Sequence, residues 1–532
     1  MTQHTDVAIV GAGPVGTLLA ILLGKRGVKV TLIERWPTLY DRPRAVTMDH
    51  EVARILATFG IDANDDPLIA YFDELYYWKN AERENLQIVD WKSVSPSGWR
   101  VTYWFNQPEL ETRLLGIAAD IPEITLLRGW QAIDIEQDAS GVTLALKETE
   151  EIRGPDGESD SVRAAYVVGC DGANSFVRER LEIPVVDKGY FFDWLILDMV
   201  PDSDYVCSPA QWQLCDPRRP TTIVPGGPGR RRWEFMVLPG ESADEIATED
   251  SAWRLLEPWG LTPHNARLER SAVYRFQARW ADTWRRGRCL IAGDAAHLMP
   301  PFAGEGMCAG FRDAVNLAWR LAAVVQGTSK DALLDSYATE RIPHARHYID
   351  FSQELGNIIC IADPDEAAER DRTMMAALAA RNGEPLNPDH VSLGPGVLCA
   401  DTPAAGELSV QGVVDYAGKR DRFDQAVGQG WFILGIEADP VSALSSTQRD
   451  CFARLGGRVI TVGETGGPWD VIDTDGTYKR WRRDINRAFV ILRPDFYVAA
   501  TADSHTELAA RLDEILTGLH LTQGHEAVHN TQ

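Results

Sequence analysis

The pattern of apolar and polar positions near the N-terminus predicts a strand, a helix and a second strand in close succession. Residues 7–10 form a short apolar run typical of a buried parallel strand. Residues 17–26 are apolar on most sides and predict a buried helix. Residues 28–33 predict a second strand that ends at Glu34. This strand–helix–strand unit is the framework of a nucleotide-binding fold.

A glycine-rich turn, Gly11-Ala-Gly13-Pro14-Val-Gly16, joins the first strand to the helix. Gly11 permits a tight turn, Gly13 lets the backbone approach a pyrophosphate, and Gly16 allows close packing of helix and strand. The helix N-terminus offers N–H groups to the anion. Glu34 follows Gly11 by 23 positions, close to the roughly 20 of a dinucleotide fingerprint, and can accept hydrogen bonds from both ribose hydroxyls. NAD and FAD both stay open at this point.

Two later segments place an aspartate directly after a predicted strand. Residues 164–170 predict a strand followed by Asp171 and Gly172. Residues 287–292 predict another, followed by Gly293 and Asp294. The chain then passes through a proline- and glycine-rich stretch into a helix that begins near Phe311 and carries apolar residues at helical spacing.

Together, these three segments resemble the FAD-dependent aromatic-ring hydroxylases of the p-hydroxybenzoate hydroxylase type. Stretches at 216–220, 232–240 and 491–501 resemble the 3-(3-hydroxyphenyl)propionate hydroxylase subfamily, and the resemblance covers nearly the whole chain. It implies FAD as cofactor, NADH or NADPH as electron donor, O₂ as co-substrate, and hydroxylation of a phenolic ring through a flavin C4a-hydroperoxide. A 3-(3-hydroxyphenyl)propionate-like substrate is expected. A polycyclic or heteroaromatic substrate, or a non-catalytic FAD-binding or redox-sensing protein, are the alternatives.

The same resemblance assigns residues to the cofactor. Asp171 belongs to the motif on the FAD side, Arg178 is associated with nicotinamide dinucleotide use, and Asp294 would hold the ribityl chain. Glu305 stands where the family often has Gln, and whether it faces the cofactor or solvent stays open. The expected FAD-binding residues are Gly11, Gly13, Pro14, Gly16, Glu34, Arg35, Arg44, Gln107, Asp171, Asp294, Pro301, Gly304, Gly306, Met307 and Cys308.

Three residues are candidates for catalysis. His50 opens a predicted helix at 51–59 and could serve as a general base, because an unperturbed imidazole titrates near neutrality; a solvated helix start is the alternative. His297 follows Asp294 closely, and a packing histidine is equally compatible with the sequence. The resemblance favours Arg44 as an arginine of the FAD phosphate or the substrate. No metal site is expected, since His344 and His347 lack a third ligand.

The expected fold class is α/β, with a Rossmann-like FAD-binding domain, an inserted antiparallel-sheet substrate domain and a C-terminal thioredoxin-like domain. The expected domains are 1–180 and 281–390 for FAD, 181–280 for the substrate sheet, and 391–532 for the C-terminal domain. Residues 394–396 predict a linker. Because the C-terminal domain has no C-x-x-C, a role in packing or subunit contact is expected. Trp212, Thr222 and Trp233 are expected to line the substrate cavity, with ordinary core as the alternative for Trp212.

Composition and charge narrow the partners. Apolar residues make up 45% and charged residues 25% of the 532 residues, the balance of a soluble globular protein. A net charge of −25 argues against nucleic acid and anionic membranes as partners. Eight scattered cysteines, and the lack of a stretch of about 20 apolar residues, predict a soluble cytoplasmic protein with reduced thiols. A small phenolic substrate is the expected partner, and a homodimer stays open.

Overall fold

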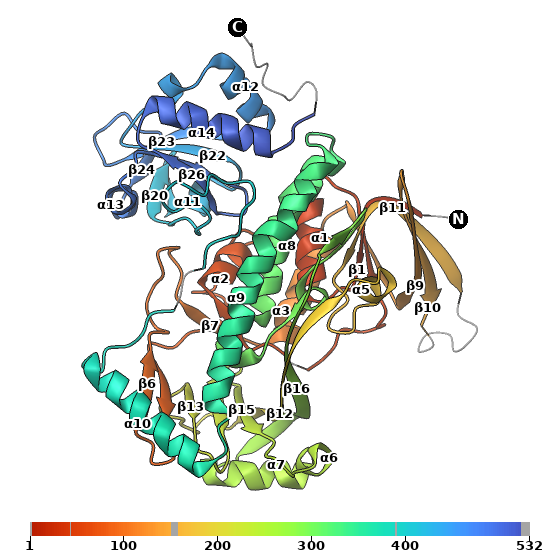
Figure 1. The fold of residues 1–532 in the computed structure, drawn as a ribbon, viewed down its shortest axis with the longest axis vertical. Coiled ribbons are helices and arrows are strands. Elements are labelled where there is room, and N and C mark those ends of the chain that lie inside the picture. Colours follow the sequence, from red (N-terminus) through yellow and green to blue (C-terminus); the bar gives the residue numbers. More distant parts are fainter. Residues whose placement is uncertain (1–2, 43, 150–157, 389–390, 523–532) are drawn as a thin grey trace.

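The structure, a computed structural model, describes residues 3–42, 44–149, 158–388 and 391–522. The outer limits 1, 390 and 532 of the expected domains lie outside this description. Figure 1 shows a nucleotide-binding unit around β1 (Gln3–Val10) and a second sheet at the opposite end from the C-terminal unit. Two long helices, α8 (Gly306–Val325) and α9 (Asp335–Ile359), run between them.

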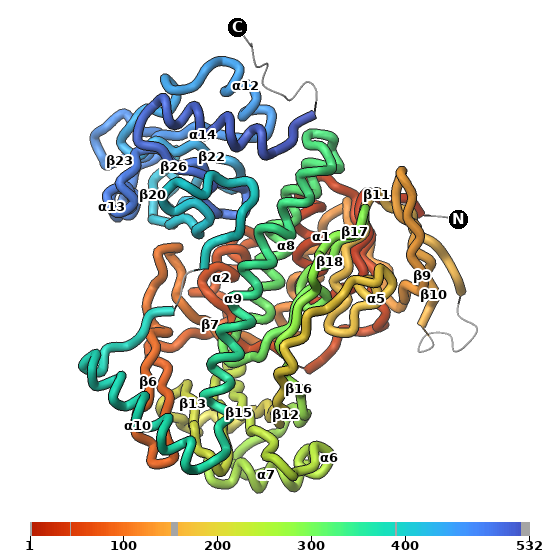
Figure 2. The backbone as a smooth tube through the Cα atoms, in the orientation of Figure 1, coloured from red at the N-terminus to blue at the C-terminus, as the bar shows by residue number. Residues whose placement is uncertain are grey.

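The nucleotide-binding unit is built on a largely parallel sheet. Strand β1 pairs in parallel with β2 and β11, and β11 pairs in parallel with β18, so a late segment completes a sheet that the N-terminal strand begins. Figure 2 shows the green β18 beside β11. The strand order is β17 (Arg285–Arg286), β18 (Cys289–Ile291), β11 (Ser159–Gly169), β1 (Gln3–Val10), β2 (Val30–Glu34) and β8 (Ile124–Arg128), with β10 (Gly141–Glu148) between β11 and β9 (Trp130–Asp138).

Helices cover this sheet and pack closely on one another. A Cβ atom on Gly310 of α8 would lie 2.6 Å from Cγ2 of Val15 in α1, so this crossing requires a glycine. Buried Val7, Ala8 and Ile9 of β1 form part of the core beneath these helices. The helices of this unit are α1 (Pro14–Gly24), α2 (His50–Ala57), α3 (Gln107–Ala119), α5 (Phe176–Arg180), α8 (Gly306–Val325) and α9 (Asp335–Ile359), beside a small sheet of β3 (Thr47–Asp49), β7 (Thr102–Phe105) and β4 (Ile69–Ala70).

The second sheet is antiparallel except where β13 pairs in parallel with β5. The expected substrate domain at 181–280 lacks β5, β6 and β19, which join this sheet from outside that range. These three strands are short, and the pairing of strands far apart in the chain cannot be recognised from the local sequence. The order is β19 (His297–Leu298), β16 (Ala266–Ala281), β12 (Val185–Pro201), β15 (Arg231–Met236), β14 (Thr221–Pro225), β13 (Trp212–Leu214), β5 (Tyr76–Lys79) and β6 (Asn85–Val89). Helices α6 (Ala243–Ile246), α7 (Glu249–Leu256) and α10 (Pro364–Ala380) lie at this end.

The C-terminal unit has the α/β character expected of a thioredoxin-like domain. Helix α14 buries Leu508, Leu512, Ile515 and Leu516, the apolar face that the sequence predicts. Its strand order is β21 (Lys419–Arg422), β20 (Val413–Tyr416), β24 (Val471–Asp473), β23 (Arg458–Gly463), β22 (Phe432–Ile436), β25 (Phe489–Leu492) and β26 (Val498–Ala502). Its helices include α11 (Phe423–Ala426), α12 (Ser446–Arg454), α13 (Thr477–Ile485) and α14 (His505–Gly518).

A buried ion cluster fastens the C-terminal unit to the long helices. Arg493 of the C-terminal unit pairs with Glu340 of α9 at 2.7 Å and with Asp495 at 2.6 Å. Arg320 of α8 lies 2.5 Å from the same Glu340 carboxylate. The expected linker at 394–396 is packed against this cluster, because a Cβ on Gly396 would lie 2.1 Å from Oε1 of Glu340.

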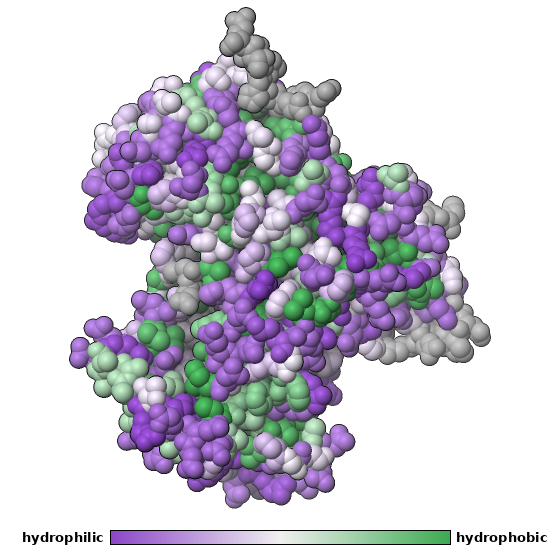
Figure 3. All heavy atoms as spheres, viewed as in Figure 1, coloured by the Kyte–Doolittle hydropathy of each residue, from purple (hydrophilic) through white to green (hydrophobic). Residues whose placement is uncertain are grey.

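The face of the molecule in Figure 3 is mostly hydrophilic, with smaller apolar areas between. Among the described helices, none is long and apolar enough to span a membrane.

Candidate active site

The turn between β1 and α1 has the geometry that a pyrophosphate requires. Gly11 adopts a φ of +102°, and a Cβ there would lie 2.4 Å from the Cys170 carbonyl oxygen. A Cβ on Gly16 would lie 2.0 Å from the Gly11 carbonyl oxygen, whereas one on Gly13 would meet no described atom within 4 Å. Pro14 begins α1, and no described side chain caps this helix. The backbone at Gly13 and the helix N-terminus therefore offer an open position for an anion.

Glu34, at the end of β2, braces this turn. One carboxylate oxygen accepts the backbone N–H of Ala12 at 2.9 Å, and the other accepts that of Trp36 at 2.9 Å. Each oxygen keeps a lone pair that can accept a ribose hydroxyl. The neighbouring Arg35 is exposed, with its guanidinium 4.9 Å from the Trp36 ring centroid. This edge of the sheet thus offers both an acceptor for ribose hydroxyls and a cation.

Asp294 lies at the same edge of the sheet, in the turn that follows β18. Its side chain is accessible to solvent, and among the described residues it has charged neighbours but no hydrogen-bond donor. Protein atoms still surround it, and the loss of hydration raises its pKa, with His297 and Arg44 opposing the change. A partly desolvated carboxylate is stabilised by hydrogen-bond donors, and the hydroxyl groups of a ribityl chain fit this requirement.

Asp171 binds within its own segment. Its carboxylate accepts hydrogen bonds from Ser175 Oγ at 2.5 Å and from the Val177 N–H, in the first turn of α5, at 3.0 Å. Arg178 donates from Nη1 to the Ala295 carbonyl oxygen at 2.9 Å, next to Asp294. Asp171 therefore orders its own loop, and Arg178 joins that loop to the Asp294 turn through the carbonyl oxygens of Ala173 and Ala295.

Gln107 positions the loop that carries Arg44. Its side chain is 3% exposed, so it is not a solvated loop amide. Its Oε1 accepts the backbone N–H groups of Arg44 at 3.2 Å and Ala45 at 2.6 Å. The Arg44 guanidinium lies 2.9 Å from Glu111 Oε1 and remains half-exposed. Arg44 can therefore face a phosphate group while its backbone is held from behind.

The turn before α8 is shaped by two glycines. Gly304 has a φ of +71°, and a Cβ there would lie 2.6 Å from Thr47 Cγ2. A Cβ on Gly306 would meet Met299 Cγ at 4.0 Å, its nearest described neighbour, so this position is open. Pro301 is exposed and begins the short 3-10 helix Pro301–Ala303 that leads into the turn.

Helix α8 begins at Gly306, and no described side chain caps its N-terminus. Met307 and Cys308 lie in the first turn, where backbone N–H groups have no partner within the helix. The Cys308 thiol is buried, and loss of hydration raises its pKa far above the usual range, so it stays a neutral thiol. Open glycine backbone, an uncapped helix start and the carboxylates of Glu34 and Asp294 together fit FAD.

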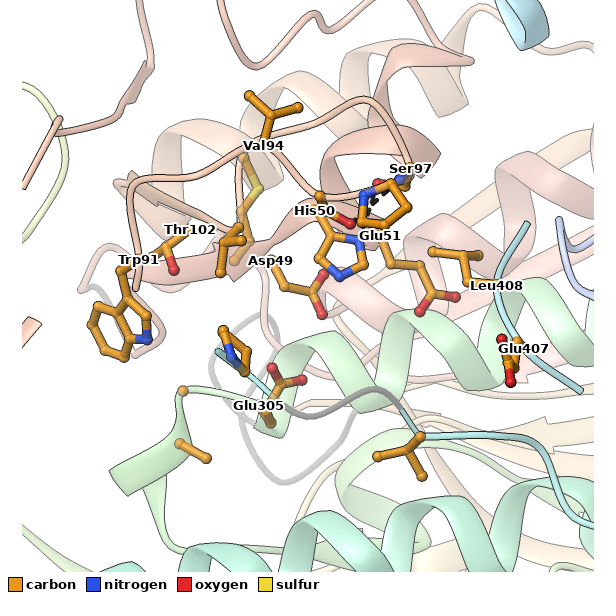
Figure 4. Close-up of a pocket in the computed structure, with 18 of the residues that line it drawn as sticks. Asp49, His50, Glu51, Trp91, Val94, Ser97, Thr102, Glu305, Glu407 and Leu408 are labelled. Atoms are coloured by element: carbon orange, nitrogen blue, oxygen red, sulfur yellow. Dashed lines mark hydrogen bonds between the residues drawn. The ribbon is translucent and has the colours of Figure 1, made fainter. Parts of the chain in front are cut away.

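A cavity of about 970 Å³ lies where the three units meet. Its walls come from β5 and β6, from segments between 91 and 102, from the turn at 302–305, and from α9. Residues 407–411 and 475–497 of the C-terminal unit close another side. Figure 4 shows Asp49, His50 and Glu305 from different elements directed into one region.

Arg312 of α8 is buried in this cavity wall and binds three carboxylates. Its Nε donates to Glu51 at 2.7 Å, its Nη1 donates to Glu305 at 2.7 Å, and its Nη2 donates to Asp49. The hydroxyl of Tyr497, from the C-terminal unit, donates to the same Glu51 oxygen at 3.0 Å. One positive charge thus faces three acidic groups, which we call the Arg312 cluster.

The acidic groups of the Arg312 cluster have different pKa values. Loss of hydration raises the pKa of Glu305 to about 7, Arg312 opposes this change, and Asp49 adds to it. Loss of hydration also raises the pKa of Glu51. For Asp49 the loss of hydration is outweighed by Arg312 and by the hydrogen bond from the Val52 N–H, so its pKa is lowered. Glu305 is therefore the group of this cluster that titrates near neutral pH.

Flat aromatic side chains form the cavity wall on the side of the second sheet. Tyr76 stacks on Trp91 with ring centroids 3.9 Å apart and ring planes 5° apart. Trp78 is buried beside them, and Phe302 reaches the cavity from the glycine turn. Such walls bind an aromatic ring and exclude water from it.

Trp212 and Trp233 do not line this cavity. Strand register pairs Trp212 with Ile223 and Ile223 with Trp233, so the three side chains share one face of the sheet. That face packs against α7 and Trp259, whose ring centroid lies 5.5 Å from that of Trp212. Periodicity predicts two faces but does not say which one is covered by a helix that comes later in the chain.

Thr222 faces the cavity side of the sheet but lies in a polar row outside the cavity lining. Its hydroxyl donates to Gln213 Oε1 at 2.6 Å. Beside it Arg232 pairs with Asp198 at 2.7 Å. Loss of hydration raises the pKa of the adjacent Glu234 to about 6. The expected substrate contact of Thr222 is thus replaced by a hydrogen bond within the sheet.

The two candidate histidines have different surroundings. His50 lines the cavity, with Nδ1 3.1 Å from Ser97 Oγ. His297 is buried away from the cavity: its Nε2 lies 2.8 Å from Asp313, and its ring lies 5.3 Å from that of Trp284. His297 is therefore a packed, hydrogen-bonded core residue, because its side chain turns inward toward α8.

Sequence reasoning missed the Arg312 cluster. A usable signal was present, since Arg312 lies at the start of a helix whose apolar residues recur at helical spacing, and a charge buried with such a helix needs partners. The acidic residues on both sides of His50 were a second signal. Tyr497 gave none, because it lies 446 positions from Glu51.

Comparisons with known proteins agree with this geometry. Residues 4–352 match the family model described as "FAD binding domain", and residues 406–516 match "HcaD C-terminal domain". A Rhodococcus jostii (strain RHA1) protein named "Probable NADH-specific resorcinol 4-hydroxylase" is 35% identical, over 97% of this chain and 96% of that protein. A Klebsiella pneumoniae (strain 342) protein named "3-(3-hydroxy-phenyl)propionate/3-hydroxycinnamic acid hydroxylase" is 33% identical, over 99% of this chain and 97% of that one. The crystal structure of the flavin-dependent monooxygenase PieE has a similar fold, with a TM-score of 0.80 at 21% identity, covering 97% of this chain and 99% of PieE.

Proposed function

We propose that this chain, which belongs to the FAD-dependent aromatic-ring hydroxylases, hydroxylates a small uncharged phenol of the resorcinol type with NADH as electron donor. The relative named for NADH and resorcinol, 35% identical over nearly the full length of both chains, supports this choice. The chain binds FAD, and when bound FAD supplies the reducing equivalents and the activated oxygen.

The charge of the cavity is the observation that carries the substrate proposal. Its described lining includes six carboxylates but two arginines, Arg312 and Arg480. Arg312 is saturated by its three acidic partners. Arg480 donates to the Asp475 carbonyl oxygen and to Thr477 Oγ1, at 2.8 Å and 3.0 Å, beside an acidic wall. A substrate that carries its own carboxylate would enter against this field.

The size of this effect can be estimated. Two like charges about 8 Å apart repel by ~2 kcal/mol at an effective dielectric constant of ~20. That energy corresponds to roughly 30-fold in affinity. A neutral dihydroxybenzene avoids this penalty, whereas a phenylpropionate does not. The 33% identity to a hydroxyphenylpropionate hydroxylase keeps a phenylpropionate as the second candidate.

The chain's own residues have distinct tasks in this proposal. The turn at Gly13 and the start of α1 bind the pyrophosphate, Glu34 binds the adenosine ribose, and Arg44 binds a phosphate. Asp294 binds the ribityl chain, and the first turn of α8 binds the flavin edge. The aromatic wall around Tyr76 orients the substrate ring and excludes water.

A substrate panel tests the proposal on the FAD-loaded protein. Resorcinol, 3-(3-hydroxyphenyl)propionate and the matched amide of that acid are compared, with NADH and with NADPH. The acid and the amide have nearly the same shape and differ in charge. Hydroxylated product and hydrogen peroxide are measured for each NADH consumed.

We expect resorcinol to give the highest kcat/KM, the amide to exceed the acid by about tenfold or more, and NADH to be preferred. A higher kcat/KM for the acid than for the amide would overturn the charge argument and support the phenylpropionate. NADH oxidation that no phenol stimulates would contradict the hydroxylase function.

A further inference from the structure

We propose that Glu305 is the base that accepts the proton of the substrate's phenolic hydroxyl group, an inference that rests on the proposed function. Glu305 lies in the cavity wall between Gly304 and Gly306, in the turn that precedes α8. The open backbone of Gly306 and the uncapped start of α8 form the flavin site of the proposed function. The carboxylate is thus placed at the boundary between the flavin site and the cavity.

Of the three acidic groups in the Arg312 cluster, Glu305 is the one best placed to meet a ligand. One carboxylate oxygen of Asp49 accepts a hydrogen bond from Arg312, and the other accepts the Val52 N–H and so caps the N-terminus of α2. Glu51 uses one oxygen for both Arg312 and Tyr497. Glu305 has the largest exposed side-chain fraction of the three, 15% against 11% for Asp49 and 6% for Glu51.

One oxygen of Glu305 is held and the other is available. Oε2 accepts Nη1 of Arg312 at 2.7 Å. Among the described residues, none donates a hydrogen bond to Oε1. A group that must move a proton needs this arrangement, because one fixed oxygen orients the carboxyl group while the second faces the reactant.

Charged and titratable groups face Glu305 from every element that packs here. Arg312 and Cys308 face Glu305 from α8, Asp49 and Glu51 from β3 and α2, and Tyr348 from α9. The imidazoles of His50, His344 and His347 line the same cavity. Carboxylate oxygens of Asp49 and Glu305 lie within 4.8 Å of one another, and Figure 4 shows these side chains pointing toward each other. The crowding of like charge favours the uptake of one proton by the cluster.

The proposed step moves one proton and no electrons. The phenolic O–H bond breaks, the proton forms a bond to Glu305 Oε1, and the electron pair stays on the phenolate oxygen. The total charge of the cavity is unchanged, since the negative charge moves from the crowded cluster to the substrate ring. The ring becomes more electron-rich, as attack on an electrophilic oxygen requires.

The raised pKa of Glu305, about 7, makes it a stronger base than an ordinary glutamate of pKa 4.5. A phenol with a pKa near 10 lies about 3 units above Glu305 and about 5.5 units above an ordinary glutamate. The equilibrium for proton transfer from the phenol to Glu305 is therefore roughly 300-fold more favourable than for transfer to an ordinary glutamate. Because the base must be ionised, kcat/KM should rise with pH and level off above about 7.

The test uses a phenol whose anion absorbs visible light, 4-nitrophenol, added to the FAD-loaded protein near pH 7, where Glu305 is partly ionised. We expect binding to wild type to increase the nitrophenolate band relative to free 4-nitrophenol, and binding to Glu305→Gln to give no such increase. Glu305→Asp keeps the acid and should restore part of the band. Glu407→Gln is the matched control, because Glu407 is an exposed carboxylate of the same cavity outside the Arg312 cluster.

The pH profile of kcat/KM with the best substrate of the panel gives an independent readout. The Glu305→Gln variant should lose the rise near pH 7 and about 100-fold or more in rate, while Glu407→Gln keeps the rise. FAD content and melting temperature show whether each variant is folded; if Glu305→Gln is not, Glu305→Asp must shift the rise for the proposal to stand.

An unchanged nitrophenolate band and an unchanged pH rise in folded Glu305→Gln would overturn the assignment. Loss of both in His50→Asn, with both kept in Glu305→Gln, would assign the base to His50 and overturn it as well. A wild-type protein that binds nitrophenolate but hydroxylates no phenol contradicts the proposed function, and the band then still decides whether Glu305 takes the proton.

Discussion

Replacement of Glu340 by Gln should loosen the attachment of the C-terminal unit. The Glu340 carboxylate is fully buried and accepts hydrogen bonds from Arg493 at 2.9 and 2.7 Å, from Asn316 at 2.9 Å and from the Val397 N–H at 2.8 Å. Glutamine keeps the shape but removes the charge, which leaves Arg320 and Arg493 buried with one acidic partner. Breaking a buried ion pair typically costs about 3–5 kcal/mol.

The pKa of Glu340 gives a second measure of the same interaction. Loss of hydration opposes ionisation, but Arg320 and Arg493 outweigh it and lower the pKa from 4.5 to about 2. That difference corresponds to about 3 kcal/mol of stability. Since the folded-state pKa lies below the unfolded one, this stability is present above pH 4.5 and is lost as the pH falls toward 2.

Urea unfolding of wild type, Glu340→Gln and Glu354→Gln should be followed by circular dichroism and by tryptophan fluorescence at pH 7, 4 and 3. Glu354 lies on the same helix but is exposed, so its replacement is the matched control. We expect Glu340→Gln to be about 3 kcal/mol less stable at pH 7, with the gap to wild type narrowing toward pH 3. A difference below about 0.5 kcal/mol, or one that is constant with pH, would refute this account of the cluster.

Three further replacements test the placement of the other residues. Trp212→Ala should lower the free energy of unfolding by about 3–5 kcal/mol and leave the peroxide formed per NADH unchanged; increased peroxide at unchanged stability would return Trp212 to the cavity. Asp294→Ala should yield protein with much less FAD than wild type after gel filtration, and stoichiometric FAD would refute its contact with the ribityl chain. Glu34→Ala should weaken FAD by about 1–3 kcal/mol in a fluorescence titration, because it removes both the ribose acceptor and the brace at Ala12; unchanged affinity would place the ribose elsewhere.

The parts of the fold that local sequence could predict are those fixed by local chemistry. The turn at Gly11 requires a positive φ and a close approach to Cys170, and glycine is the residue that satisfies both requirements. The buried face of α14 follows helical periodicity for the same reason. Glu34 stands at the strand end where the fingerprint spacing places it, and Asp294 follows β18, where the family motif places it.

Other features depend on which distant segments meet. Trp212 obeys strand alternation, but the helix that covers its face comes about 40 residues later. His297 sits two elements from the flavin turn and still points into the core, because Asp313 offers it a partner there. The substrate cavity itself combines β5, α8 and the C-terminal unit, so no single stretch of sequence describes it.

Because β18 completes the nucleotide sheet, this sheet cannot finish folding until residue 291 has been synthesised. The β11 strand ends at Gly169, and β18 ends at Ile291, about 120 residues later. At roughly 5–20 residues per second, a ribosome needs about 6–24 s to make that stretch. During this interval the edge of β11 waits without the strand that will cover it, while the inserted strands of the second sheet are already emerging. A slow stretch of translation after residue 291 would favour docking of β18 before the C-terminal unit appears, and a chaperone that shields the β11 edge would act most usefully before that point.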